Sequence, residues 1–212
     1  MLTSSLVDQL YDITKEKIVN LQLKLGEKID VQGLAEQFGV SQTPVRDALN
    51  RLSQNGLVNS KARVGYYVVK LSAEDITEIY DLRKMFEGYA LESTIENIKS
   101  DELRQLKQKM ERIQGKIDEK TTEFEETDRE LHLSIIKNSN NKRLQSLFSQ
   151  IYNFVRISIS MGVEWKKSLK EHIALVEALQ EKDLARAKEI LKEHIDNSRD
   201  NAIEALQNSS LK

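Results

Sequence analysis

Residues 34–52 read Leu34-Ala-Glu-Gln-Phe-Gly-Val-Ser-Gln-Thr-Pro-Val-Arg-Asp-Ala-Leu-Asn-Arg-Leu52. The apolar residues of the first half have the spacing of one buried helical stripe. Gly39 suits the left-handed conformation that ends many helices. Ser41 is a good N-cap, and Pro44 falls in the first turn of the following helix, where its missing N–H is tolerated. The segment therefore predicts a helix, a tight turn and a second helix.

The second of these helices has one apolar face and one polar face. Val45, Ala48, Leu49 and Leu52 form the predicted buried stripe. The outward side chains, Gln42, Thr43, Arg46 and Asn50, can donate to phosphates and base edges, and a helix of this size fits the major groove of DNA. An ordinary helical hairpin with a solvated face is the alternative interpretation.

The following residues favour DNA binding. Residues 57–60 and 66–70 are rich in strand-forming side chains, and the turn between them, residues 61–65, is basic and ends in Gly65. A helix-turn-helix followed by a small hairpin is a winged helix, whose Lys61 and Arg63 would reach the DNA backbone or minor groove. Residues 41–70 carry a net charge of +4, although the whole chain carries −2, so positive charge is concentrated where DNA contact is predicted.

Residues 5–70 resemble the GntR family of bacterial transcription regulators. The resemblance is carried by Gly26-Glu-Lys-Ile29, Leu34-Ala-Glu36, Val40-Ser-Gln-Thr-Pro-Val-Arg-Asp-Ala-Leu49, Gly56-Leu-Val58 and Gly65. It implies contact with a double-stranded DNA operator through Ser41, Gln42, Thr43, Arg46, Asn50, Lys61, Arg63 and Gly65. Gln42 departs from the family, which commonly has arginine there. Fewer phosphate-binding cations predict weaker nonspecific binding, a shallower salt dependence or a different operator preference.

Composition sets the class of the rest of the chain. The chain has 212 residues, one proline, eight glycines and no cysteine, which favours long helices and excludes disulfides and thiolate metal sites. No signal peptide is visible, and no apolar run approaches the roughly 20 residues of a membrane helix. We therefore expect a cytoplasmic protein that does not enter the membrane.

A domain boundary is predicted between residues 71 and 72. Residues 1–71 form the predicted winged helix-turn-helix, with its first helix over 5–23 and a loop over 24–29. Residues 72–212 form a predicted antiparallel, all-helical bundle of about six helices, which makes the fold class mainly α. These helices are expected at 72–98, 101–118, 121–138, 141–162, 164–181 and 184–206, each beside its neighbour in sequence, with residues 207–212 frayed.

The chain has three histidines, His132, His172 and His194. Asp128 lies one helical turn before His132 and shares its face. His172 and His194 are equidistant from Asp183, where the last two helices turn, so their imidazoles are predicted to face each other. Three imidazoles and one carboxylate suit a divalent transition metal, and zinc, nickel and manganese all remain open. The alternative is that each histidine is an ordinary core or surface residue.

Residues 72–206 resemble the FCD effector domain of FadR-type GntR regulators. The matching residues are Asp128-Arg-Glu-Leu-His132, Glu171-His172, Leu175, Ala178-Leu179, Asp183, Ala187 and His194-Ile195, with Arg83 and Glu87. The resemblance implies that Asp128, His132, His172 and His194 hold the metal and that a small carboxylate completes its shell. Arg83 and Arg156 are the candidate anchors for such an organic acid, and Tyr152 and Asn153 are weaker candidates.

These observations favour a ligand-responsive transcription regulator that binds a palindromic operator as a homodimer. Two alternatives remain, a dedicated metal-ion sensor and a helical-bundle metalloenzyme. No further carboxylate or histidine stands out as a general base, and the winged helix would be unexplained in an enzyme. We therefore expect no catalytic residues.

Overall fold

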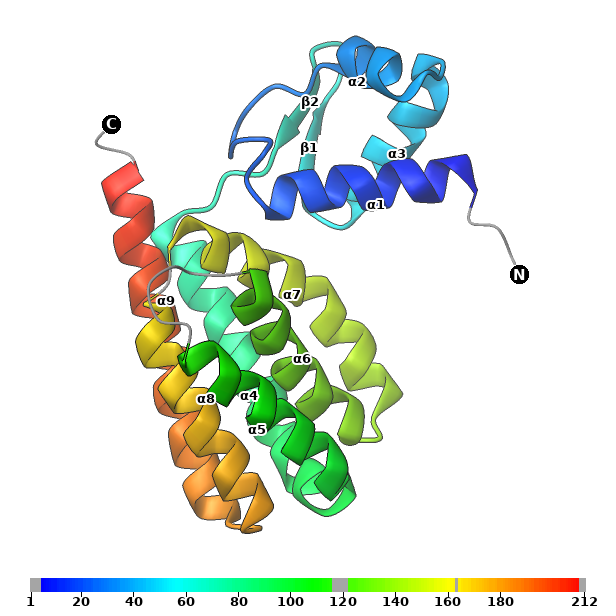
Figure 1. Cartoon of the computed structure of the whole chain (residues 1–212). Coiled ribbons are helices and arrows are strands. Elements are labelled where there is room, and N and C mark those ends of the chain that lie inside the picture. The colour runs from blue at the N-terminus through cyan, green and yellow to red at the C-terminus, as the bar shows by residue number, and fades with distance from the viewer. Residues whose placement is uncertain (1–4, 116–121, 163, 210–212) are drawn as a thin grey trace. The chain divides into compact units, whose positions relative to one another are not determined.

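A computed structural model of the chain describes residues 5–115, 122–162 and 164–209. The chain divides into two compact units, Met1–Ser72 and Ala73–Lys212, one residue after the boundary expected from the sequence. The described residues are mostly helical, with one small two-stranded sheet in the first unit (Figure 1). Each unit is considered by itself below.

The first unit is a winged helix-turn-helix. Its elements are α1 (Leu6–Val19), α2 (Val31–Phe38), α3 (Gln42–Gln54), β1 (Val58–Lys61) and β2 (Gly65–Val68). Helix α1 begins with a capping box between Ser5 and Asp8, which satisfies backbone amides of its first turn. The sequence predicted a helix that continues to residue 23, but α1 ends at Val19, and Leu21 has a positive φ of 56°, which a continuing helix does not allow.

The turn between α2 and α3 follows the sequence prediction closely. Gly39 has φ 64°, in the left-handed region, and the four apolar residues of α3 are buried. Ser41 occupies the N-cap position of α3, but its side chain makes no capping hydrogen bond to the described backbone. The predicted capping role of the Ser41 hydroxyl is therefore wrong.

The wing contains more pairing than the sequence predicted. Strands β1 and β2 are antiparallel, with Val58 opposite Val68 and Lys61 opposite Gly65. The segment before α2, expected to be only a loop, adds to the edge of β2. The Ile29 amide donates to the Tyr66 carbonyl at 2.9 Å, and Lys28 forms an isolated bridge with Tyr67. This pairing fixes Lys28 beside the wing.

The second unit is a helical bundle. Its helices are α4 (Ala73–Asn97), α5 (Ser100–Gln114), α6 (Thr122–Asn138), α7 (Lys142–Met161), α8 (Trp165–Gln180) and α9 (Leu184–Ser209). The expected ends at residues 118 and 121 lie outside the described residues. The fraying predicted from residue 207 is wrong as far as residue 209, because α9 continues to Ser209; residues 210–212 are also outside the described part.

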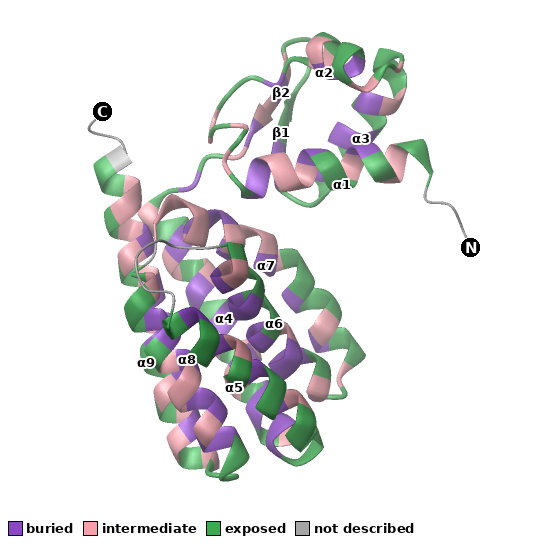
Figure 2. Ribbon diagram, viewed as in Figure 1, coloured by how far each residue is buried: buried purple, intermediate pink, exposed green. Residues whose placement is uncertain are grey.

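Helix α4 is the centre of the bundle. Among the described helices it packs on α6, α7 and α9, whereas α5 packs on α6 and α8. The expectation that every helix lies beside its neighbour in sequence is therefore wrong for α4 with α5 and for α7 with α8. The inner side of α4 carries a buried stripe that includes Ile76, Tyr80, Arg83, Glu87 and Ala90, and buried residues gather between the helices (Figure 2). A central helix with charged residues on its buried side requires buried partners for them.

No helix in the described ranges is both long enough and apolar enough to cross a membrane.

Candidate metal centre and nucleic-acid surface

The polar face of α3 has the predicted orientation. Gln42, Thr43, Arg46 and Asn50 are exposed, while the apolar residues on the other side of α3 pack into the core of the first unit. Arg46 donates to the Gln42 side chain at 3.2 Å, and the Asn50 side-chain oxygen accepts from the Tyr66 hydroxyl at 2.8 Å. Both outward groups are therefore oriented by neighbours within the unit.

An open groove runs between α3 and the wing. The charged and amide side chains that line it include Lys28, Gln32, Gln42, Arg46, Lys61 and Arg63. Lys61 lies with its ammonium 4.8 Å from the centre of the Tyr67 ring. Gly65 has φ 133°, and a Cβ there would come within 3.3 Å of the Lys28 side chain. Glycine at this position therefore leaves room for the Lys28 side chain.

The sequence reasoning missed Lys28, although its family motif was recognised, because residues 24–29 gave no strand pattern. Arg51, also on α3, has a structural role. It contacts Asp8 at 2.6 Å and lies over the Tyr11 ring at 4.9 Å, which joins α3 to α1. The Ser5 and Arg51 hydrogen bonds hold the pKa of Asp8 down, at about 2.

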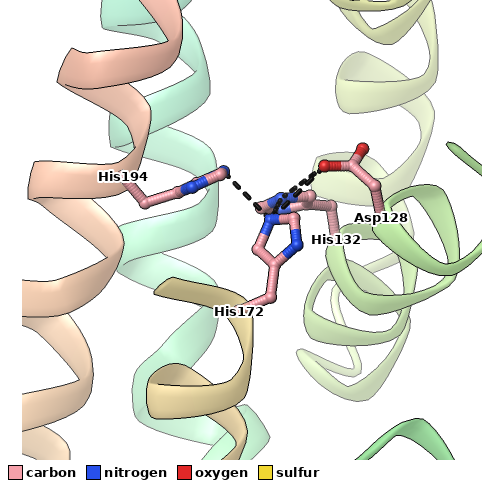
Figure 3. A group of neighbouring side chains, drawn as sticks. All are labelled: Asp128, His132, His172 and His194. Carbon is pink, nitrogen blue, oxygen red and sulfur yellow. Dashed lines mark hydrogen bonds and ion pairs between the residues drawn. The ribbon is translucent and has the colours of Figure 1, made fainter. Parts of the chain in front are cut away.

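The second unit brings the four predicted ligands together from three helices. Asp128 and His132 come from α6, His172 from α8 and His194 from α9 (Figure 3). Each offers one ligand atom, and these four atoms lie within 4.8 Å of one another. All four residues are buried. The prediction that the imidazoles of His172 and His194 face each other is confirmed, since their Nε2 atoms are 3.2 Å apart.

The three separations from His172 Nε2, at 3.2–3.3 Å, are those of neighbouring ligands around one ion, and the Asp128–His132 separation is longer. His132 Nε2 lies 3.3 Å from His172 Nε2, and Asp128 Oδ1 lies 3.3 Å from His172 Nε2 and 3.8 Å from His132 Nε2. Two ligands about 2.1 Å from a metal are roughly 3.0–3.4 Å apart at octahedral or tetrahedral angles. The donor set, three imidazole nitrogens and one carboxylate oxygen, fits a divalent transition metal.

Two further carboxylates hold the outer nitrogens of the imidazoles. Glu87 of α4 lies 2.6 Å from His132 Nδ1, and Glu171 of α8 lies 2.8 Å from His194 Nδ1. A carboxylate accepts hydrogen bonds, so it favours a proton on Nδ1 and leaves Nε2 as a lone-pair donor. The unprotonated nitrogens of His132 and His194 then point into the cluster.

Burial sets the protonation of the centre. It lowers the pKa of all three imidazoles well below their ordinary value, because a charged imidazolium is costly without water. Metal ligation requires the neutral imidazole, so the environment favours the competent form. Burial also raises the pKa of Glu87, and the adjacent Arg83 opposes that shift.

The candidate effector residues are placed differently from one another. Arg83 is fully buried, and its Nε donates to Glu87 at 2.7 Å. Its Nη1 and Nη2 are buried without a hydrogen-bond partner among the described residues, and so is the Tyr152 hydroxyl. Arg156 and Asn153 are half-buried on α7, and the charge of Arg156 acts on the pKa of Tyr152, which burial raises.

Sequence reasoning did not identify the roles of Glu87 and Glu171 beside the imidazoles. Both residues were noted only as parts of motifs. The usable signal is that Arg83 and Glu87 are one turn apart on a helix whose other buried residues are uncharged. Trp165, the first residue of α8, lies against Phe124 with ring centres 6.1 Å apart.

Comparison with known proteins agrees with both units. The family model for bacterial regulatory proteins of the gntR family matches residues 6–68, and the FCD domain model matches residues 78–197. The chain is 31% identical over 193 residues to the uncharacterized HTH-type transcriptional regulator YdhC of Bacillus subtilis, which covers 88% of this chain and 84% of YdhC. The chain thus belongs to the GntR family of bacterial regulatory proteins, and its second unit carries an FCD domain.

Solved structures agree with the fold. E. coli McbR/YncC has a TM-score of 0.80 at 24% identity, covering 98% of this chain and all of that one. The Zn2+-bound FCD domain of TM0439 has a TM-score of 0.59 at 27% identity, covering 65% of this chain and 98% of that one. The chain is a ligand-responsive, DNA-binding transcription regulator, and its relatives are regulators rather than enzymes.

Replacing Arg46 tests the DNA-binding surface. Arg46→Ala should weaken binding to an operator fragment selected from random DNA by about 1–3 kcal/mol, because a base-reading arginine is lost. Fluorescence anisotropy at fixed salt measures the change. Arg104→Ala, an exposed change in the second unit, is the matched control. Equal affinities for the two variants would contradict the assignment of α3 as the reading helix.

The histidine environment predicts a pH dependence of stability in metal-free protein. Above the ordinary histidine pKa of 6.5, neither the folded nor the unfolded chain is protonated there. Below it the unfolded chain takes up protons that the buried imidazoles do not, so the free energy of unfolding falls. Between about pH 7.5 and about pH 5.5, the free energy of unfolding measured with urea should fall more in wild type than in His172→Asn. An equal loss would contradict the burial of a neutral His172.

Proposed function

We propose that this regulator senses a small organic acid through a divalent metal in its second unit and binds its operator as a homodimer through its first. Asp128, His132, His172 and His194 would hold the metal. The observation that carries this proposal is that their ligand atoms, all within 4.8 Å of one another, lie in the same buried core as the Arg83 guanidinium, two of whose nitrogens have no hydrogen-bond partner among the described residues.

The arrangement of protons supports the metal. Glu87 and Glu171 leave unprotonated Nε2 atoms on His132 and His194, both directed at His172 Nε2. Buried lone pairs that face one another repel, and a cation among them removes that repulsion. A bound divalent ion would supply Lewis acidity toward an anionic ligand. Nitrogen and oxygen donors suit zinc, nickel or manganese, and the zinc in the TM0439 domain favours zinc.

The charged and polar groups near the centre support an acidic effector. The Arg83 guanidinium is buried, and one edge of it is used by Glu87. Its other nitrogens offer the paired donors that bind a carboxylate in two places. The Tyr152 hydroxyl lies close enough to Asp128 and Arg83 for their charges to act on its pKa. Arg156 and Asn153, on the same helix as Tyr152, would bind more distant parts of the acid.

The homodimer follows from the DNA-binding surface. Residues 41–70 of one chain carry a net charge of only +4, which gives few phosphate contacts, and two half-sites on a two-fold operator double them. Ser41, Gln42, Thr43, Arg46, Asn50, Lys61, Arg63 and Gly65 would form each contact surface. Light scattering should give twice the 24.4 kDa of one chain; a monomer at operator-binding concentrations would contradict the dimer.

Metal removal tests the proposal. Ligands from three helices cross-link the bundle, so the binding free energy of the metal adds to folding. A chelator should lower the melting temperature of the protein, and His194→Ala should lower it and weaken zinc binding. Lys137→Ala, an exposed change on α6, is the control. Calorimetry and zinc competition measure both quantities.

Operator affinity then decides whether the site regulates. It should be measured for wild type and His194→Ala, each with zinc alone and with zinc plus any organic acid that co-purifies. We expect a change of several-fold that requires both zinc and acid in wild type and is absent in His194→Ala. A full response to zinc alone would instead indicate a dedicated metal sensor. The same affinity in every condition would mean that the centre is structural and that the regulatory proposal is wrong.

A further inference from the structure

We propose that Glu87 is a positioning residue that selects the metal-binding tautomer of His132 and holds it through Arg83. Glu87 has no exposed surface, and neither has Arg83 or His132. One oxygen of Glu87 accepts from Arg83 Nε at 2.7 Å, and the other lies 2.6 Å from His132 Nδ1. The carboxylate therefore joins the central helix α4 to a candidate ligand on α6.

The chemistry of the two partners leaves one arrangement of protons. A guanidinium only donates, and an ionised carboxylate only accepts. His132 must therefore carry its proton on Nδ1 in order to bond to Glu87. Its Nε2 is then unprotonated and faces His172 Nε2 at 3.3 Å. The Arg83 guanidinium has no acceptor to offer in place of its donors. Its contact with Glu87 therefore fixes the position of the His132 proton.

Glu171 provides a comparison within the same site. It lies 2.8 Å from His194 Nδ1 and accepts from the Asn197 amide at 2.7 Å. Asn197 differs from Arg83 because its amide carries both a donor and an acceptor and can turn over. If Glu171 became glutamine, Asn197 could present its oxygen to the new amide. His194 would then keep its Nδ1 proton.

Glutamine at position 87 has no such adjustment. Its oxygen would face the positively charged Arg83, because an amide NH2 against a guanidinium sets donor against donor. Its NH2 would then face His132 Nδ1, which must become an acceptor. The proton of His132 would move to Nε2, the atom that the metal needs. Glu87→Gln thus disables a ligand without altering any of the four ligand residues.

The same reasoning predicts a rescue. In Arg83→Met with Glu87→Gln, nothing fixes the amide oxygen on the Arg83 side, so the amide can turn that oxygen to His132 Nδ1. The double variant also removes a buried cation together with its counter-charge, which avoids leaving Arg83 uncompensated. We expect it to recover the Nδ1-protonated tautomer that Glu87→Gln alone loses.

Two measurements on the full chain test this proposal. The first is the 15N chemical shift of each imidazole in metal-free protein labelled at histidine, which reports the tautomer directly. The second is zinc affinity by competition with a chelator; this second measurement rests on the proposed function. The variants are Glu87→Gln, the Arg83→Met/Glu87→Gln double variant, Glu171→Gln and a control, Glu102→Gln. Glu102 is a half-buried carboxylate of α5 that bonds to Ser134 of α6, so the control makes the same chemical change elsewhere in the bundle.

The expected results separate positioning from charge or folding effects. Glu87→Gln should move His132 to the Nε2-protonated form and weaken zinc binding by about 10- to 100-fold, the usual range for a lost second-sphere partner. Glu171→Gln should leave the His194 tautomer unchanged and lose less affinity than Glu87→Gln. The double variant should restore the Nδ1-protonated His132 and most of the lost affinity. Glu102→Gln should match wild type in both measurements.

Three results would overturn the proposal. These are an Nε2-protonated His132 in wild type, an unchanged His132 tautomer in Glu87→Gln, or a double variant with the tautomer of Glu87→Gln. Wild type binding no zinc would reject the proposed metal instead, and the tautomer measurements would still decide the role of Glu87. If Glu87→Gln does not fold, the wild-type and double-variant spectra make the decision.

Discussion

The helical unit depends on burying three imidazoles and several charges in one place. His132, His172 and His194 are almost fully buried, and His172 Nε2 lies 3.3 Å from His132 Nε2 and 3.2 Å from His194 Nε2. Burying polar groups without partners costs free energy, and here carboxylates satisfy two of the outer nitrogens. The inner nitrogens converge with Asp128 on a single position, which is what a metal centre requires. Helices α4, α6, α8 and α9 supply the side chains of this cluster and its two carboxylate partners.

Helix α4 follows the wing in the chain and also carries residues of the bundle core. It begins at Ala73, five residues after β2 ends at Val68, and it supplies Arg83 and Glu87 to the core of the bundle. In the proposed function, an acid bound by Arg83 would act on α4 directly, and a metal bound by His132 would act on α4 through Glu87. Regulation then requires that α4 has two arrangements to which metal and acid bind with different affinity.

The helix-turn-helix and the histidine cluster could be predicted from the sequence because their signals are local or periodic. The helix-turn-helix was readable from Gly39, Pro44 and the buried stripe of α3. The meeting of His172 and His194 followed from their equal distance from Asp183. The order of helices in the bundle did not follow, because short loops restrict which helices can be neighbours but do not decide it. The strand pairing of Lys28 was missed because it is a single bridge without a periodic pattern.

The supporting residues of the centre were harder to predict for a physical reason. Glu87 and Glu171 act through contacts between different helices, and such contacts depend on helix rotation rather than on spacing along one chain segment. The Asn197 contact with Glu171 spans 26 residues. A buried carboxylate on the inner side of a helix indicates a partner without identifying it.

X-ray absorption spectroscopy of the zinc-loaded protein tests the central claim most directly, because it reads the atoms around the metal. The proposed centre predicts about three imidazole nitrogens at roughly 2.0–2.1 Å with one or more oxygens at about 2.0–2.2 Å, and a loss of one imidazole in His194→Ala. A shell of oxygen atoms without imidazole scattering, or the same shell in His194→Ala, would show that zinc binds elsewhere and would contradict the account.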